Sequence, residues 1–151
     1  SETEKEVQDC IAAHGMSPVR WLDHLGVLGD NVIAAHVVHI DEEEAEILKE
    51  RGVWIAHNPC SNMKLSSGIF ASDLLMKKGC RLTLGTDGTA SNNNLDMREE
   101  MKLPPCLLRS VTQARHCPPA KFCNGQPATA RRQLVLTPVL FVKGHLRMPF
   151  S

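Results

Sequence analysis

The sequence has no excess of charge of either sign and no long hydrophobic run. Lysine plus arginine and aspartate plus glutamate number 17 each, so the formal net charge is zero. This balance gives no support for a nucleic-acid partner or an anionic membrane surface. No stretch approaches the roughly 18 apolar residues of a membrane-spanning helix. The opening residues, SETEKEVQD, are acidic and polar, so we expect no signal peptide and no membrane partner.

Paired cysteines are also absent. The six cysteines include no C-x-x-C pair and fit no common zinc or disulfide template. We therefore expect free thiols in a reducing compartment, with the cytoplasm as the location. The chain begins without methionine, which favours a piece of a longer protein.

Apolar residues recur in a pattern that alternates helices with short buried strands. Helices are predicted over Glu2–His14, from Ser17 to Leu25, over Asp41–Arg51 and over Ile69–Lys78. Strands are predicted over Val32–Val38, Val53–His57 and Arg81–Leu84, with Asn58–Asn62 as a loop. Strands that alternate with helices at this spacing predict an α/β fold with a parallel sheet.

Three polar side chains lie at or near the carboxyl ends of these strands. They are His36, His57 and Asp87. In a parallel α/β barrel these strand ends meet on one face, so the three groups are expected to share one site. Two imidazoles and a carboxylate suit Zn²⁺ or Fe²⁺, and a cation of this kind activates water near neutral pH.

Each of these residues also fits a purely structural role. Either histidine alone is typical of a hydrogen-bonded core residue, and Asp87 alone is typical of a turn cap. Burying all three together without a partner would be costly, which favours a shared site.

Two long motifs carry a family resemblance. They are HNPxSNxKLxSG, within AAHVVHIDEEEAEILKERGVWIAHNPCSNMKLSSG, and GTDGxASNNxLD, within GCRLTLGTDGTASNNNLDM. The sequence from Ser1 to Lys102 resembles the amidohydrolase superfamily, in the branch of 5-methylthioadenosine/S-adenosylhomocysteine deaminases and related chlorohydrolases. The resemblance implies that residues 1–102 are the C-terminal half of a (β/α)₈ barrel, covering about strands five to eight.

The resemblance also implies roles for individual residues. His36 would be a metal ligand after the fifth strand, and Asp87 a ligand after the eighth that also transfers protons. His57, after the sixth, would polarise the substrate or orient the water. One Zn²⁺ or Fe²⁺ per complete barrel would carry a hydroxide that attacks an amino-bearing carbon of an adenosine-type purine, and ammonia would leave.

Two further residues stand at substrate-binding positions of the family. Many deaminating relatives have an acid three residues after the strand-five histidine, where this chain has His39, facing either substrate or solvent. Glu2 matches the acid of the family's HxSET segment, although the histidine of that segment would precede Ser1.

The family's His-x-His metal pair and its first four strands are not in the sequence. A complete barrel takes roughly 250 residues, so we expect this chain by itself to be inactive. Guanine deamination and triazine dechlorination or deamination are alternatives within the superfamily. A non-catalytic remnant and a small metal-binding module are alternatives outside it. The expected partner is a nucleoside substrate, and a homo-oligomer of the full-length parent is left open.

The resemblance ends after Lys102, where residues 103–151 become rich in proline, cysteine and arginine. A divergent or disordered extension is one interpretation of this tail. We favour a frameshift, because Pro118–Gly125 read from the third codon position permits Ala-Ser-Glu-Val-Leu-Gln-Trp. Leu103–Leu108 likewise permits Ala-Ala-Leu-Leu, as in an amphipathic helix.

Overall fold

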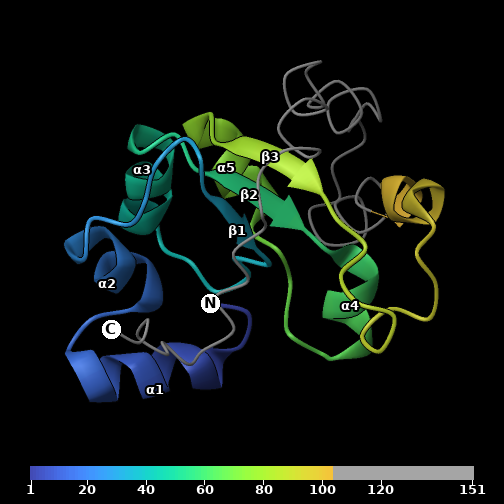
Figure 1. Ribbon diagram of the computed structural model, residues 1–151, viewed down its shortest axis with the longest axis horizontal. Coiled ribbons are helices and arrows are strands. Elements are labelled where there is room, and N and C mark those ends of the chain that lie inside the picture. Colours follow the sequence, from blue (N-terminus) through green and yellow to red (C-terminus); the bar gives the residue numbers. More distant parts are fainter. Residues whose placement is uncertain (104–151) are drawn as a thin grey trace, which may run out of the picture.

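The computed structural model describes residues 1–103 (Figure 1). The predictions for residues 104–151, including the frameshift, lie outside the described residues. The helices are α1 (Glu4–His14), α2 (Pro18–His24), α3 (Glu42–Glu50), α4 (Pro59–Lys64) and α5 (Ser72–Lys78). The strands are β1 (Ile33–Ala35), β2 (Trp54–His57) and β3 (Arg81–Leu84). Residues 97–103 form a further helical segment.

The three strands form one parallel sheet in the order β1-β2-β3, which confirms the predicted α/β arrangement. Consecutive strands of a (β/α)₈ barrel are neighbours. Because β2 pairs directly with β3, no strand lies between them. The prediction that β1, β2 and β3 are the fifth, sixth and eighth strands is therefore wrong in its spacing. If β3 is the eighth strand, then β2 is the seventh and β1 the sixth.

Capping residues define several helix ends. Thr3 and Asp41 each begin a helix with a capping box, and Gly79 ends α5 with a left-handed φ of 78°. Ser17 precedes α2, but its side chain makes no cap hydrogen bond. Its hydroxyl instead donates to the buried Glu44 carboxylate, which links α2 to α3.

Two elements differ from the sequence prediction. Strand β1 ends at Ala35 rather than continuing to Val38, because His36 and Val37 have left-handed φ angles of 67° and 46°. The predicted loop at Asn58–Asn62 is instead the start of helix α4, with Pro59 at its first turn.

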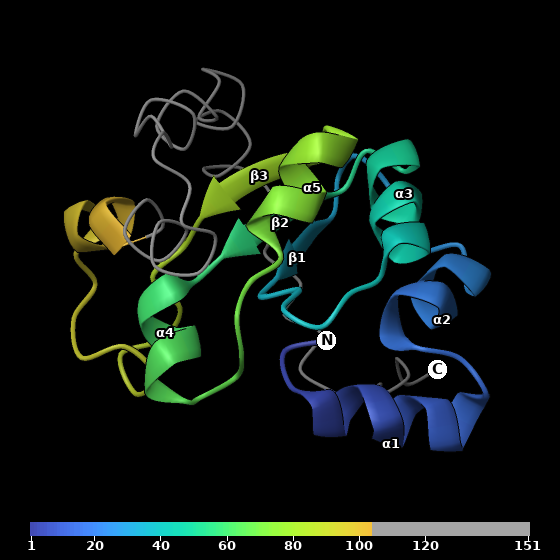
Figure 2. The same ribbon diagram turned by 180° about the vertical axis from the view of Figure 1, so that it is seen from behind.

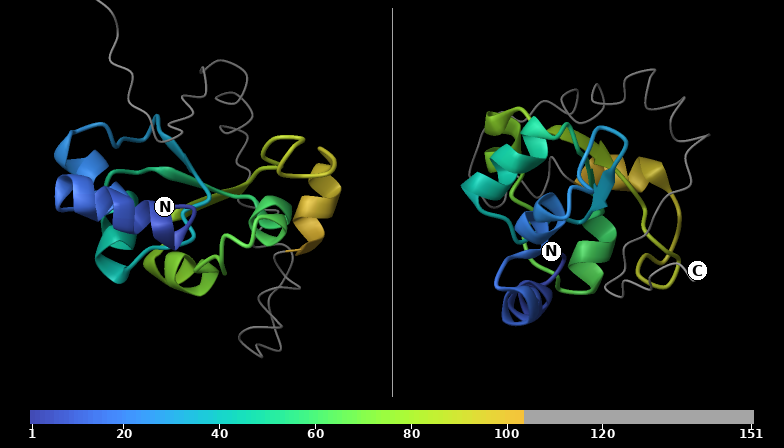
Figure 3. Two further views of the ribbon diagram at one scale, coloured as in Figure 1. Left: turned by 90° about the horizontal axis from the view of Figure 1, so that it is seen from below. Right: turned by 60° about the vertical axis from the view of Figure 1, so that its left-hand side comes forward.

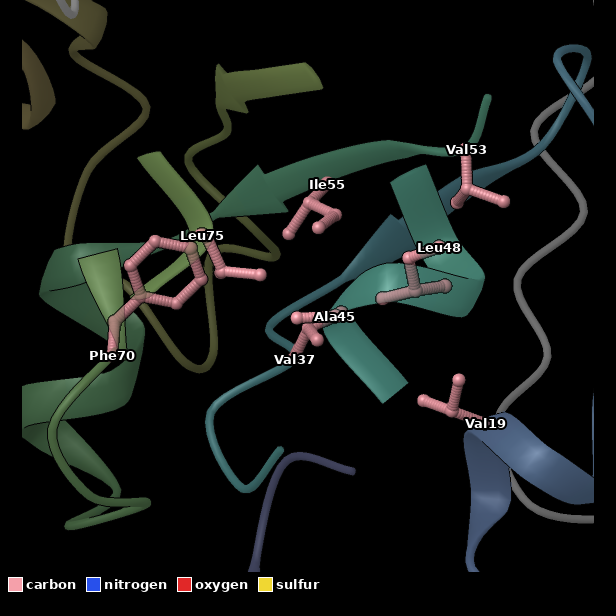
Figure 4. Close-up of a cluster of buried hydrophobic side chains, with 8 residues drawn as sticks. All are labelled: Val19, Val37, Ala45, Leu48, Val53, Ile55, Phe70 and Leu75. Atoms are coloured by element: carbon pink, nitrogen blue, oxygen red, sulfur yellow. The ribbon is translucent and has the colours of Figure 1, made fainter. Parts of the chain in front are cut away.

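The hydrophobic core lies between the sheet and helices α3 and α5, which cover one face of it (Figure 2). The buried cluster in Figure 4 includes Ile55 of β2, Leu48 of α3 and Leu75 of α5. In the sheet register Ile55 is aligned with Ala34 and Leu82, which pack against this cluster. Side chains alternate between faces along a strand, so the next row of aligned residues points to the other face of the sheet.

No helix in the described part of the chain is long and apolar enough to cross a membrane.

Replacing Ile55 by alanine is expected to lower the free energy of unfolding by about 2–5 kcal/mol, because the side chain is fully buried and leaves a cavity. Urea unfolding followed by circular dichroism measures the change. Ile69→Ala is the matched control, since this isoleucine is 69% exposed and its loss should cost below about 0.5 kcal/mol. Equal losses in the two variants would contradict the assigned core.

Candidate active site

The candidate site lies at the carboxyl edge of the sheet, beside α4 and the N-terminus (Figure 1). His36 directly follows β1, His57 is the last residue of β2, and Asp87 lies three residues after β3. The N-terminal segment reaches the same edge because the backbone N–H groups of Val38 and His39 donate to Ser1 O, at 3.0 and 3.2 Å.

Two carboxylates face one imidazole nitrogen in this site. The Nε2 atom of His36 lies 3.8 Å from Asp87 Oδ2 and 3.8 Å from Glu2 Oε2. All three side chains are largely withdrawn from solvent. The structure thus brings together three of the residues that the sequence singled out, and each carries an atom that can accept a proton.

The Asp87 carboxylate is held in place by two serine hydroxyls. Ser61 Oγ of α4 and Ser91 Oγ each donate to Asp87 Oδ2 at 2.7 Å. Burial, the largest single influence, would raise the pKa of Asp87. The hydrogen bonds from Ser91, Ser61 and the Gly88 backbone, together with the charge of His36, outweigh it and lower that pKa. Asp87 is therefore kept as the anion, the form that accepts protons or binds a cation.

His57 is buried next to this group. Its ring stacks on Phe70 with centroids 4.1 Å apart, and its Nδ1 atom lies 3.4 Å from the Asn62 amide nitrogen. Burial, followed by the proximity of His36, lowers the pKa of His57 from 6.5 to about 4. His57 is consequently a neutral imidazole at neutral pH, able to accept at one nitrogen and donate at the other.

His39 is not brought into the group around His36. Its Nε2 atom lies 2.7 Å from the Ser67 carbonyl oxygen, and its Nδ1 atom lies 3.2 Å from Glu4 Oε2. Both ring nitrogens thus contact acceptors on neighbouring segments. Its predicted contact with substrate remains a prediction, while these contacts give it a role in joining α1 to the segment after α4.

Backbone strain is concentrated in the same place. His36, Val37 and Asp87 all have left-handed φ angles, and for the β-branched Val37 this conformation is rare. Hydrogen bonds hold the first of these turns, with His36 N donating to Ala56 O and Val37 N donating to Ala35 O, both at 2.9 Å. Strain of this kind, at about 1–3 kcal/mol per residue, is typical of functional sites.

Sequence reasoning missed the residues that support Asp87. Ser61 lies within the HNPxSNxKLxSG motif, which could have pointed to it. Because a loop was predicted at Asn58–Asn62, its contact with Asp87 was not expected. Glu100 is fully buried and accepts from Cys60 N of α4 at 3.3 Å and from Asn92 Nδ2 at 2.6 Å. Asn92 also donates to Thr86 O at 2.8 Å. Figure 3 shows the helical segment 97–103 beside α4.

The donor atoms fit a divalent metal in kind but not in number. An imidazole nitrogen and a carboxylate oxygen are typical ligands of zinc. Within residues 1–103, however, no three histidine, cysteine, aspartate or glutamate side chains are gathered closely enough to hold a metal ion. This segment can therefore supply at most part of a coordination shell.

Comparison with known proteins identifies the family of the chain. A profile of the amidohydrolase family matches residues 1–123. The chain belongs to the amidohydrolase family. Among its relatives, a 5'-deoxyadenosine deaminase of Methanopyrus kandleri is 54% identical over 107 residues, which are 71% of this chain and 25% of that protein. A 5-methylthioadenosine/S-adenosylhomocysteine deaminase of Dictyoglomus thermophilum is 47% identical over 121 residues, covering 80% and 28%.

A solved structure agrees with this amidohydrolase assignment. The adenosine deaminase of Xanthomonas campestris with bound zinc superposes with a TM-score of 0.70 at 41% sequence identity. The match covers 74% of this chain and 26% of that one. The chain thus spans about a quarter of the length of the relatives that it matches.

In the metal-free chain the His57 ring is expected to titrate near pH 4, which NMR of its ring protons measures directly. Unfolding exposes the ring and restores a pKa near 6.5, so the unfolded state binds the proton first as pH falls. The contribution of neutral His57 to the free energy of unfolding is therefore complete above pH 6.5. It is lost progressively as the pH falls to about 4, by on the order of 3 kcal/mol.

His57→Gln is the matched variant for this prediction, because it removes the titrating group and keeps a polar side chain. Its free energy of unfolding should fall less over the same pH window than that of the wild type. A His57 midpoint near 6.5 would contradict the buried neutral imidazole.

Proposed function

We propose that this chain forms part of the active site of a metal-dependent amidohydrolase that deaminates an adenosine-type purine. The observation that carries the proposal is the convergence of Glu2 and Asp87 on His36 Nε2, at 3.8 Å each. The names of relatives about half identical to this chain, a 5'-deoxyadenosine deaminase and 5-methylthioadenosine/S-adenosylhomocysteine deaminases, support the substrate class. Substrate, metal and partners of the complete protein are all part of the proposal.

The sheet order redistributes the roles that the resemblance implied. With β3 as the eighth strand, Asp87 keeps its place as a metal ligand and proton acceptor. His36 then follows the sixth strand, and the role of the sixth-strand histidine, orienting the attacking water, passes from His57 to His36. The fifth-strand ligand would come from a segment before Ser1. His57 becomes a buried neighbour of the site on the seventh strand.

The proposed chemistry uses the acceptors that the chain provides. In this proposal a bound divalent cation such as zinc would supply an activated water at neutral pH. His36 Nε2 would accept a hydrogen bond from that water and orient it. Asp87, held as an anion by Ser61 and Ser91, would take up the water's proton as its oxygen bonds to the amino-bearing carbon, and would pass that proton to the amino group, which leaves as ammonia. Glu2, whose Oε1 atom accepts from Ser67 Oγ at 3.0 Å, would start protonated, give its proton to the purine ring nitrogen and recover one from the added hydroxyl as ammonia leaves.

A segment exchange tests these roles. Residues 1–102 replace the aligned segment of the Methanopyrus kandleri 5'-deoxyadenosine deaminase, to which the chain is 54% identical over 107 residues. The chimera is expected to release ammonia from 5'-deoxyadenosine. In it, Asp87→Ala should lose both bound zinc and activity. His36→Ala should keep zinc but lose about 10²-fold or more in kcat, because only water orientation is removed.

The control for this exchange is Asp30→Asn, an exposed carboxylate before β1 that should leave zinc content and rate unchanged. Zinc is measured by atomic absorption and ammonia by a coupled assay. Loss of zinc in His36→Ala would return His36 to the ligand role. Full activity in Asp87→Ala would contradict the proposed function.

For the 151-residue chain by itself we expect no ammonia release from 5'-deoxyadenosine, with or without added Zn²⁺. The physical reason is that its described residues gather no three metal-binding side chains. The same coupled assay measures this, with the chimera as positive control. Zinc-dependent turnover by the chain alone would show that its ligands suffice.

A further inference from the structure

We infer that Asn58 and Asn62 select the tautomer of His36, placing hydrogen on Nδ1 and leaving Nε2 bare toward Glu2 and Asp87. Asn62 would set the opposite tautomer on His57. Both asparagines are buried, at 4% and 3% exposure; Asn58 caps the start of α4 and Asn62 lies within that helix. The tautomers follow from hydrogen bonds alone, while their catalytic meaning rests on the proposed function.

The orientation of Asn58 is fixed by backbone groups whose chemistry is unambiguous. Two backbone carbonyl oxygens, Gly85 O and His57 O, lie 3.1 and 3.3 Å from one of the two terminal atoms of its amide. Carbonyl oxygens only accept, so the nitrogen of the amide must face them. The amide oxygen is then the atom that lies 3.5 Å from His36 Nδ1. An oxygen in this place favours an N–H group on Nδ1.

Asn62 follows from the same ring nitrogen. Its Oδ1 atom lies 2.8 Å from His36 Nδ1, a normal hydrogen-bond distance. With hydrogen on Nδ1, the oxygen of Asn62 accepts from it, and two amide oxygens then share one donor. The Asn62 nitrogen is left to face His57 Nδ1 at 3.4 Å, a longer contact in which His57 Nδ1 is the acceptor. A single amide therefore imposes opposite tautomers on the two rings.

The bare Nε2 atom of His36 determines what can bind between this ring and the carboxylates of Glu2 and Asp87. This nitrogen presents its lone pair to Glu2 Oε2 and to Asp87 Oδ2, each 3.8 Å away. Asp87 Oδ2 also accepts from Ser61 and Ser91, but neither 3.8 Å contact of Nε2 includes a donor, which favours a cation, a proton or a water between the ring and the carboxylates. The reverse tautomer would aim an N–H group at the two carboxylates, so the ring itself would be the donor and no added cation, proton or water would be required. Asn62 is thus a positioning residue, because it acts on the site only through His36 and His57.

An NMR experiment on the ¹⁵N-labelled 151-residue chain tests the inference without metal or substrate. Long-range ¹H–¹⁵N spectra distinguish a protonated from a bare ring nitrogen, at a pH above the ordinary imidazole pKa of about 6.5. The expected spectrum shows His36 with hydrogen on Nδ1 and His57 with hydrogen on Nε2. Hydrogen on His36 Nε2 in the wild type would overturn the inference.

Asn62→Asp separates tautomer selection from a general structural role. An ionised aspartate has two acceptor oxygens and no N–H group, so His36 should keep its tautomer while His57 moves its hydrogen to Nδ1. The ¹⁵N shifts of the two His57 nitrogens should therefore exchange. Asn31→Ala, at an exposed asparagine, is the control and should leave both rings unchanged. An unchanged His57 in Asn62→Asp would overturn the role of Asn62.

The result is independent of the proposed function. Tautomers as expected together with a chimera that lacks activity would leave this inference standing and reject the deaminase assignment. An active chimera with the reverse His36 tautomer would reject only the inference.

Discussion

The hydrogen bonds made by the short helix α4 are the interactions on which the site depends. Ser61 binds the carboxylate of Asp87, and Asn62 contacts both His36 and His57. Lys64, at the end of the same helix, donates to Ala90 O at 2.9 Å. One helix of six residues thus fixes side chains at or just after the ends of all three strands. Parallel pairing brings these strand ends to one edge, and α4 sets how their polar groups are aimed.

These hydrogen bonds also stabilise a conformation that the local sequence does not favour. Left-handed φ angles at His36, Val37 and Asp87 cost about 1–3 kcal/mol each. An exposed loop would relax such angles, whereas here the side chains of His36 and Asp87 are held by partners from α4. The strained turns in return direct an imidazole and a carboxylate toward each other. Backbone strain and the geometry of the site are therefore linked through the same contacts.

Sequence patterns predicted the parts of this fold that have a local cause. Strand β3 and the start of helix α3 at Asp41 follow from apolar runs and short-range hydrogen bonds. The gathering of His36 and Asp87 at one edge of the sheet follows from the parallel strand ends. Helix α4 could not be predicted, because its six residues, PCSNMK, show no apolar period and are stabilised by tertiary contacts. The side chain of His39 is likewise set by Glu4 and Ser67, which only the folded chain brings near.

The support behind Asp87 shows how the segment divides its tasks. Buried Glu100 has its carboxylate bound by the Cys60 N–H at the start of α4, where a helix favours negative charge, and by Asn92. Asn92 in turn holds Thr86, next to Asp87. Such a second layer fixes the position of an acceptor but contributes no metal ligand. The described segment is accordingly built to orient proton-accepting groups, while a complete metal shell requires ligands from outside it.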